Sequence, residues 1–194
     1  MRTCFWSTER IRIRAAEEED AGFLAERRKT PDSLCQWYED AIQFPQSDKE
    51  TRDGFIKNLH EFYKDDMRLF MLESPDGAYA GQLSVWETNR RAGVFRHGIF
   101  LEERFRGLGL AKDALVIVMD FYFNELNYRK SAPYVYAYNL RSQKFHEDFG
   151  FTLEARMKEE HYSRDIYHDV LFYSLFKDAF NTRHKNDLWS ADNI

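Results

Sequence analysis

Residues 97–126 read HGIFLEERFRGLGLAKDALVIVMDFYFNEL, and this stretch decides the fold. An apolar segment ends at Leu101, a loop with two glycines follows, and an apolar-periodic segment runs on to Leu126. Its apolar side chains recur at steps of three and four residues: Ala111, Leu115, Val118, Tyr122 and Leu126. That period is typical of a helix with one buried face, so the stretch predicts a strand, a glycine loop and a helix packed on a sheet.

The loop between strand and helix is suited to an anion. The first turn of a helix has backbone N–H groups without intrahelical acceptors, and the peptide dipoles place partial positive charge there. Gly107 and Gly109 lack a Cβ, so a phosphate can approach the backbone closely, although two glycines also suffice for a tight turn. A P-loop is excluded because no Lys-Ser or Lys-Thr pair follows, and a dinucleotide fingerprint is excluded because Lys112 replaces its third small residue.

Two blocks of sequence resemble one known family. Residues 106–111 carry the spacing RxxGxA, which resembles the Q/R-x-x-G-x-G/A signature of the GNAT superfamily of acyl-CoA-dependent N-acetyltransferases; residues 104–109 fit it as well. Residues 139–151 read NLRSQKFHEDFGF and resemble the N-x-x-S...GF segment of the same family. The resemblance is best over residues 94–176, and it is nearest to the branch of ribosomal-protein N-terminal and diamine acetyltransferases.

The resemblance implies acetyl-CoA as the acyl donor and assigns residues to it. Backbone amides at the end of the strand polarise the thioester carbonyl; here they belong to Ile99, Phe100 and Leu101. Amides of the loop hold the pyrophosphate, namely those of Arg106, Gly107, Leu108, Gly109, Leu110 and Ala111. Asn139 contacts the pantetheine arm, and Ser142 belongs to the same site. A strand over residues 133–138 splays from the strand that holds Ile99, so the cofactor slots between them.

Acetyl transfer also needs an uncharged amine and a proton for the leaving thiolate. The family usually has a tyrosine acid four residues before the glycine of its GF pair, where this chain has His146. A histidine can donate a proton near neutral pH, but a surface histidine on a helix is an equal alternative. Tyr138 is the second candidate acid. Glu87 is the first candidate base because it ends the neighbouring strand; Glu102 and Glu103 are alternatives, and a solvated carboxylate is the simpler explanation of all three.

Composition bounds the class of protein. The 194 residues are 43% hydrophobic and 31% charged, enough for one large domain with a packed core. The net charge of −5 argues against a nucleic-acid binder and suits a cationic amine. Cys4 and Cys35 form neither a disulfide framework nor a zinc motif, and no metal site is expected. The sequence has no membrane-length apolar run and no signal core, which predicts a cytoplasmic protein.

The predicted architecture is α+β: a GNAT-like, mostly antiparallel sheet of six to seven strands flanked by helices, with a splayed strand pair for the cofactor. The domain is expected over residues 1–177, followed by a polar tail over residues 178–194. Two helices in the front half carry a set of aromatic and acidic side chains that would suit a cationic acceptor, although ordinary helix packing also explains the aromatics. The set is Trp37, Tyr38, Phe44, Phe55, Glu39, Asp40, Asp48 and Glu50.

Two functions follow from these observations. The first is an N-acetyltransferase that moves an acetyl group from acetyl-CoA to a primary amine, either a small cationic molecule or a protein N-terminus, by direct attack in a ternary complex. The second is a non-catalytic acyl-CoA-binding sensor or interaction module, which the histidine in place of the tyrosine keeps open. Either a monomer or a homodimer is compatible with the sequence.

Overall fold

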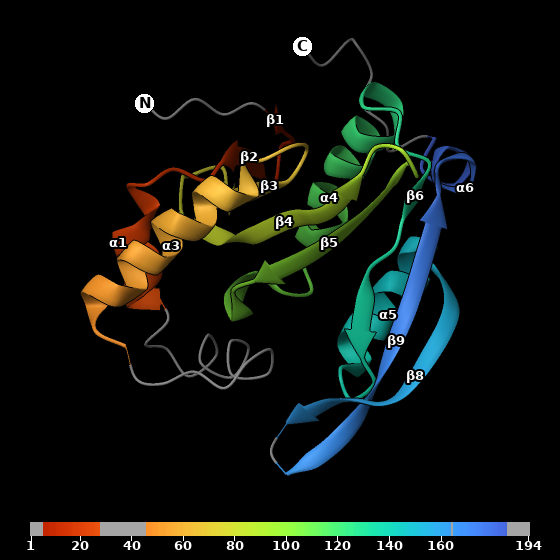
Figure 1. Cartoon of the computed structure of the whole chain (residues 1–194). Coiled ribbons are helices and arrows are strands. Elements are labelled where there is room, and N and C mark those ends of the chain that lie inside the picture. The colour runs from red at the N-terminus through yellow and green to blue at the C-terminus, as the bar shows by residue number, and fades with distance from the viewer. Residues whose placement is uncertain (1–5, 28–45, 164, 186–194) are drawn as a thin grey trace.

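The structure is a computed structural model, and it describes residues 6–27, 46–163 and 165–185. In this part of the chain nine strands form one sheet in the order β1-β2-β3-β4-β5-β6-β9-β7, with β8 also paired to β9 (Figure 1). The strands are β1 (Trp6–Ser7), β2 (Arg12–Ala15), β3 (Arg68–Glu73), β4 (Tyr79–Asn89), β5 (Val94–Leu101), β6 (Lys130–Ser131), β7 (Tyr134–Tyr136), β8 (Thr152–Ser163) and β9 (Ile166–Phe176). The helices are α1 (Asp20–Arg27), α3 (Asp48–Phe62), α4 (Leu110–Asp120), α5 (Leu140–Phe149) and α6 (Lys177–Arg183).

The prediction of a mixed α+β fold with a mostly antiparallel sheet is confirmed, since the described pairings are antiparallel except that between β5 and β6. The predicted six to seven strands are too few because the two-residue strands β1 and β6 have no periodic signal. The strand expected over residues 133–138 is also shorter. Pro133 cannot donate a backbone hydrogen bond, and it separates β6 from β7.

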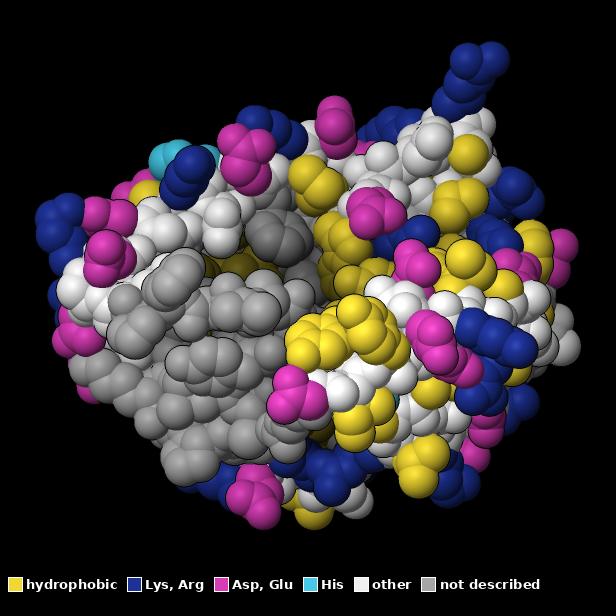
Figure 2. All heavy atoms as spheres, turned by 60° about the horizontal axis from the view of Figure 1, so that its bottom comes forward, with side chains coloured by type: hydrophobic (Ala, Val, Ile, Leu, Met, Phe, Trp, Pro, Cys, Tyr) yellow, Lys and Arg dark blue, Asp and Glu magenta, His cyan; other side chains and the backbone are white. Residues whose placement is uncertain are grey.

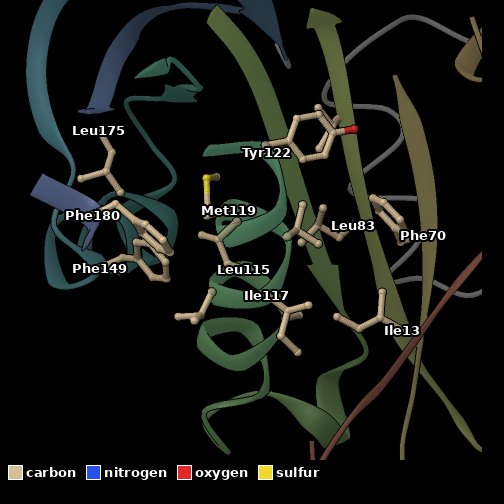
Figure 3. Packing of buried hydrophobic residues seen from close by; sticks show 14 of the residues in the cluster. Ile13, Phe70, Leu83, Leu115, Ile117, Met119, Tyr122, Phe149, Leu175 and Phe180 are labelled. Atoms are coloured by element: carbon tan, nitrogen blue, oxygen red, sulfur yellow. The ribbon is translucent and has the colours of Figure 1, made fainter. Parts of the chain in front are cut away.

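Helices cover both faces of the sheet (Figure 1). Alternation along β3 sends Leu69 and Met71 to a small cluster with Leu59 of α3, while Phe70 and Leu72 join the main core around α4. Figure 3 shows side chains of α4 packed between the strands on one side and the C-terminal segments on the other. None of the described helices is both long and apolar enough to cross a bilayer.

The sheet splits beside β5. β5 pairs with β6 in parallel at only two positions, Val94 with Lys130 and Phe95 with Ser131. β7 then pairs with β9 and not with β5, so the two strands diverge beyond Phe95. Figure 1 shows β5 and β9 spreading apart from this point. The predicted splayed strand pair is therefore present.

The prediction of a polar tail from residue 178 is wrong for residues 178–185, which form most of α6 and its end. Phe180 is fully buried, and its ring centroid lies 5.3 Å from that of Phe123 and 6.4 Å from that of Phe149. Figure 3 shows Phe180 beside Phe149. His184 Nε2 also bonds the Phe149 carbonyl oxygen at 2.9 Å. One buried aromatic gives no periodic pattern, which is why the sequence did not predict this helix. Residues 186–194 lie outside the described residues.

We expect Phe180→Ala to lower the free energy of unfolding by about 3–5 kcal/mol, because it empties a packed site between α6, α5 and the segment Phe121–Glu125 that follows α4. The matched control is Phe176→Ala, since Phe176 is 43% exposed. This control is expected to cost about 1 kcal/mol or less. Chemical denaturation of both variants measures the difference. Equal losses would show that α6 is not part of the core.

Candidate active site

A cavity of about 420 Å³ lies where the sheet splits. Its lining comes from α1, α3 and β4 on one side, from β5 and β7 on either side of the split, and from α5. Figure 2, which brings the bottom of Figure 1 forward, shows hydrophobic side chains around a hollow on this face. The cavity therefore connects the α1–α3 face of the sheet with the gap between the diverging strands.

The backbone of β5 presents polar groups to this gap. The Phe95 carbonyl accepts the Ala132 N–H on the β6 side at 2.8 Å, whereas the Glu102 N–H donates to Ala80 on the β4 side at 2.9 Å. Backbone groups of successive strand residues point to opposite sides, so Ile99 and Leu101 face the gap while Phe100 pairs with β4. Of the three predicted thioester-polarising amides, that of Phe100 is used within the sheet.

The glycine loop has the conformation that its sequence requires. Gly107 and Gly109 adopt φ values of 76° and 81°, and Gly109 is the N-cap of α4. Such left-handed conformations favour glycine. In the described part of the chain, the backbone N–H groups of residues 107–111 donate to no protein acceptor. The predicted cradle therefore has free amides at the positive end of a helix dipole.

Two arginines support this loop. Arg106 was predicted to offer its amide to the pyrophosphate, but that amide donates to the Glu103 carbonyl at 3.1 Å, so this part of the prediction is wrong. The Arg106 Nε instead bonds the Leu101 carbonyl at 2.7 Å. Arg10 donates to the Leu108 carbonyl at 3.0 Å and to Asp113 Oδ1 at 2.7 Å. These bonds fix the direction of the loop from both ends.

His146 lines the cavity and is 5% exposed, so it is not the surface histidine of the alternative interpretation. Its Nδ1 lies 2.7 Å from the Ser142 carbonyl oxygen, which can only accept, so the Nδ1 carries the hydrogen. In the neutral ring Nε2 is then an acceptor, and this buried atom has no hydrogen-bond partner in the part of the chain that the structure describes. Burial lowers the pKa of His146, which favours the neutral form. In this neutral form Nε2 can accept a proton, and only after it has done so can it donate one as an acid.

His97 is a buried polar residue of the cavity wall that the sequence analysis did not identify. Its ring is 2% exposed, and its centroid lies 5.4 Å from that of His146. Burial and the neighbouring His146 hold the pKa of His97 well below its usual value. The available signal was a histidine at an inward position of a strand, between Phe95 and Ile99.

These two histidines predict a pH-dependent stability. Both have a lowered pKa when folded, so below pH 6.5 the unfolded chain takes up protons that the folded chain does not, and the free energy of unfolding falls. The loss reaches at most about 1.4 kcal/mol per group and pH unit. The other titratable groups near His146 are Tyr173, whose pKa is raised to about 12 by burial and Glu147, and Glu147 itself. Chemical denaturation at several pH values measures this dependence. Below pH 6.5 the free energy of unfolding of the double variant His97→Phe/His146→Phe should fall less steeply with decreasing pH than that of the wild-type chain. Equal slopes for the two chains would contradict this prediction.

The structure does not bring two predicted catalytic residues into the cavity. Glu87 follows a break in the pairing of β4 with β5, adopts φ 45°, and pairs through Oε2 with Arg96 Nε at 2.6 Å. This irregularity turns the carboxylate to the rim, where it is 61% exposed. Tyr138 lies in the turn after β7, and its ring stacks on Tyr136 with 5.5 Å between centroids. Neither side chain is among the residues that line the cavity.

The cavity lining is rich in aromatic side chains and includes one carboxylate and one guanidinium group. Glu102, an alternative base in the sequence analysis, is 8% exposed and pairs with Arg27 at the cavity wall. The aromatic lining residues are Phe55, Tyr79, Trp86, Phe100, Tyr134 and Tyr136. Of the predicted aromatic and acidic set, Phe55 lines the cavity, whereas Asp48 and Glu50 lie at the exposed start of α3. Trp37, Tyr38, Phe44, Glu39 and Asp40 lie outside the described residues.

The predicted second block lies at the other wall. Asn139 is the N-cap of α5, where its Oδ1 accepts the Ser142 N–H at 3.0 Å. Both residues line the cavity with His146. Among the described residues, no three His, Cys, Asp or Glu side chains gather as metal ligands would. A split sheet with an amide-rich helix start beside it is the arrangement that the resemblance implies for an acyl-CoA-dependent acyltransferase.

Comparison with known proteins agrees with this class. The family model for the acetyltransferase (GNAT) domain matches residues 10–152, and the chain belongs to that family. An uncharacterised, SPbeta prophage-derived N-acetyltransferase of Bacillus subtilis, YokL, is 27% identical, with 95% of this chain and 99% of that protein covered. Spermidine N(1)-acetyltransferase of Escherichia coli K12 is 24% identical, with 92% of each chain covered.

A solved structure shares the fold. The crystal structure of spermidine N-acetyltransferase from Vibrio cholerae in complex with CoA and spermine matches with a TM-score of 0.75 and 21% identity, covering 89% of this chain and 99% of that one. The prediction of an N-acetyltransferase that uses acetyl-CoA is therefore confirmed at the level of the family.

Proposed function

We propose that this chain acetylates a primary amine of a small polycationic molecule, with acetyl-CoA as donor, by direct attack in a ternary complex. The observation that carries the proposal is one cavity that joins an aromatic, carboxylate-bearing wall to the gap where the thioester would lie. Aromatic faces attract ammonium groups, and a carboxylate such as that of Glu102 can accept hydrogen bonds from an ammonium group in addition to those from Arg27. Relatives named for spermidine acetylation support the same acceptor class.

The donor substrate would be held by backbone groups. Free amides of residues 107–111 would bind the pyrophosphate, since they combine N–H donors with the helix dipole. The pantetheine arm would pass through the gap between β5 and β7, beside Asn139 and Ser142. The Ile99 amide, which faces the gap, would hydrogen bond the thioester oxygen as negative charge develops on it.

The acetyl transfer needs one proton acceptor near the thioester. The uncharged amine nitrogen attacks the carbonyl carbon, and a C–N bond forms. His146 Nε2 accepts the proton that this nitrogen must lose, the C–S bond breaks with its electron pair on sulfur, and the same proton passes to the sulfur. The products are the amide and the free thiol of CoA. In this series of steps His146 acts first as the base and then as the acid. The acid role is the one that its position in residues 139–151 suggests.

The experiment is an acceptor panel read by release of free thiol, with spermidine, a simple alkyl monoamine and a peptide with a free N-terminus. We expect turnover with spermidine at the highest kcat/KM. Binding of CoA without thiol release from any amine would instead support the non-catalytic acyl-CoA-binding module.

A paired substitution tests the acceptor wall. Glu102→Gln removes the buried carboxylate, and we expect the KM for spermidine to rise roughly tenfold with little change in CoA affinity. Glu103→Gln is the matched control, because Glu103 is the exposed neighbour and does not line the cavity. Equal KM values for the two variants would show that Glu102 does not contact the acceptor.

A further inference from the structure

Two imidazoles meet at the split in the sheet, one from β5 and one from α5. His97 is 2% exposed and His146 is 5% exposed, and both line the cavity. The Nε2 atoms of both rings are buried and have no hydrogen-bond partner among the described residues. Buried polar atoms in proteins are nearly always hydrogen bonded, so two unpaired ring nitrogens in the wall of one cavity indicate a ligand that supplies their partners.

The hydrogen on the His97 ring can be located from its neighbour. His97 Nδ1 lies 3.0 Å from the hydroxyl oxygen of Ser131, which is fully buried. If the ring donated this bond, the Ser131 hydrogen and the His97 Nε2 would both lack partners. If Ser131 donates, only one group is left unpaired, the Nε2–H of His97. The second arrangement costs less because fewer buried polar groups are unsatisfied.

The two rings are therefore complementary. His146 is fixed by the Ser142 carbonyl with a lone pair on Nε2, and His97 is fixed by Ser131 with a hydrogen on Nε2. One ring accepts and the other donates, with 5.4 Å between their centroids. This spacing is compatible with one ligand atom that contacts both Nε2 atoms.

We propose that His97 is a second catalytic residue, whose uncharged Nε2–H donates a hydrogen bond to the leaving sulfur of the thioester. This role rests on the proposed acetyl transfer. His97 keeps its proton throughout: the proton that reaches sulfur comes from the amine through His146, and the His97 bond stabilises the negative charge on sulfur before that proton arrives. A fixed dipole of this kind is effective in a cavity from which water is excluded.

A ring whose role is only to pack would behave differently. His97 lies 5.4 Å from the ring of Phe151, and a phenylalanine at position 97 would keep such ring contacts. His97→Phe therefore removes the donor and keeps the shape. His97→Gln replaces the imidazole by an amide that still carries an uncharged N–H donor. Comparison of these two variants distinguishes three roles for His97: an uncharged hydrogen-bond donor, a packing group, and a group that must change its charge.

The test measures kcat, KM for the amine and CoA affinity for both variants, with the acceptor that the wild-type chain uses best. We expect His97→Phe to lower kcat by about 10²-fold with CoA affinity within about threefold of wild type. His97→Gln should recover most of kcat with the wild-type pH profile. If His97→Phe does not fold, His97→Leu replaces it beside His97→Gln.

Three outcomes decide the matter. A His97→Phe chain with wild-type kcat would leave the ring a packing group and overturn the proposal. A His97→Gln chain as slow as His97→Phe would overturn the role of an uncharged donor. Absence of thiol release by the wild-type chain with every amine would overturn the proposed function itself, and the role of His97 with it.

Discussion

We expect the His146→Phe substitution to lower kcat by about 10²- to 10⁴-fold while CoA affinity changes by less than about threefold. The reason is that His146 Nε2 is a buried acceptor without a partner among residues 6–27, 46–163 and 165–185, and that His146 lines the cavity that the amine would enter. Phenylalanine keeps a ring among Phe145, Phe151 and Tyr173 but removes both nitrogens. Steady-state thiol release and CoA titration measure the two quantities.

The control for this substitution is Tyr138→Phe. Tyr138 is the other acid that the sequence offers, but its ring stacks on Tyr136 in a turn outside the cavity lining. We expect its kcat to stay within about threefold of wild type, as for a change that touches no reacting atom. A slow Tyr138→Phe chain beside an unaffected His146→Phe chain would reverse the two assignments.

The second large effect is expected at the glycine loop. Gly109→Val should weaken CoA binding by at least about 10²-fold, which corresponds to the loss of one or two hydrogen bonds to a charged phosphate. Valine is strained at φ 81°, and its Cβ would lie 3.2 Å from the Arg10 guanidinium. The loop must therefore change its backbone, and the amides of residues 107–111 lose their common direction. Calorimetric titration with CoA measures the loss.

Gly77→Val separates backbone strain from the loss of a binding site. Gly77 has φ 87° in the turn between β3 and β4, with no atom within 4 Å of a Cβ built there. In Gly77→Val the free energy of unfolding should fall by about as much as in Gly109→Val, while CoA affinity should stay at the wild-type value. If Gly109→Val also bound CoA like the wild type, the loop would not be the pyrophosphate site.

The parts of the fold that the sequence predicted well are those with a strong local period. The strand that ends at Leu101 and the helix that follows the glycine loop are both present, as β5 (Val94–Leu101) and α4 (Leu110–Asp120). The glycine loop could be predicted because a left-handed backbone at a helix start favours glycine, and two glycines at this place are visible in the sequence. Local rules of conformation are sufficient for such elements.

The misses share a different cause, which is contact between residues far apart in the chain. Glu87 was placed at a strand end, but the pairing irregularity that turns it away depends on the register with β5. The environment of the His97 ring is set by Ser131, thirty-four residues later in the chain, and by the ring of His146. The Arg106 amide is used by a turn that the motif does not specify. No periodic pattern records these contacts, and they decide which side chains reach the cavity.

The most direct measurement is the amide ¹H–¹⁵N spectrum of the chain titrated with CoA and, separately, with pantetheine, which lacks the pyrophosphate. We predict that CoA shifts the Gly107 and Gly109 amides strongly and that pantetheine at saturation leaves both in place while it shifts Ile99 and Leu101. Unchanged glycine amides in the presence of bound CoA would contradict the account, because the diphosphate would then be held elsewhere.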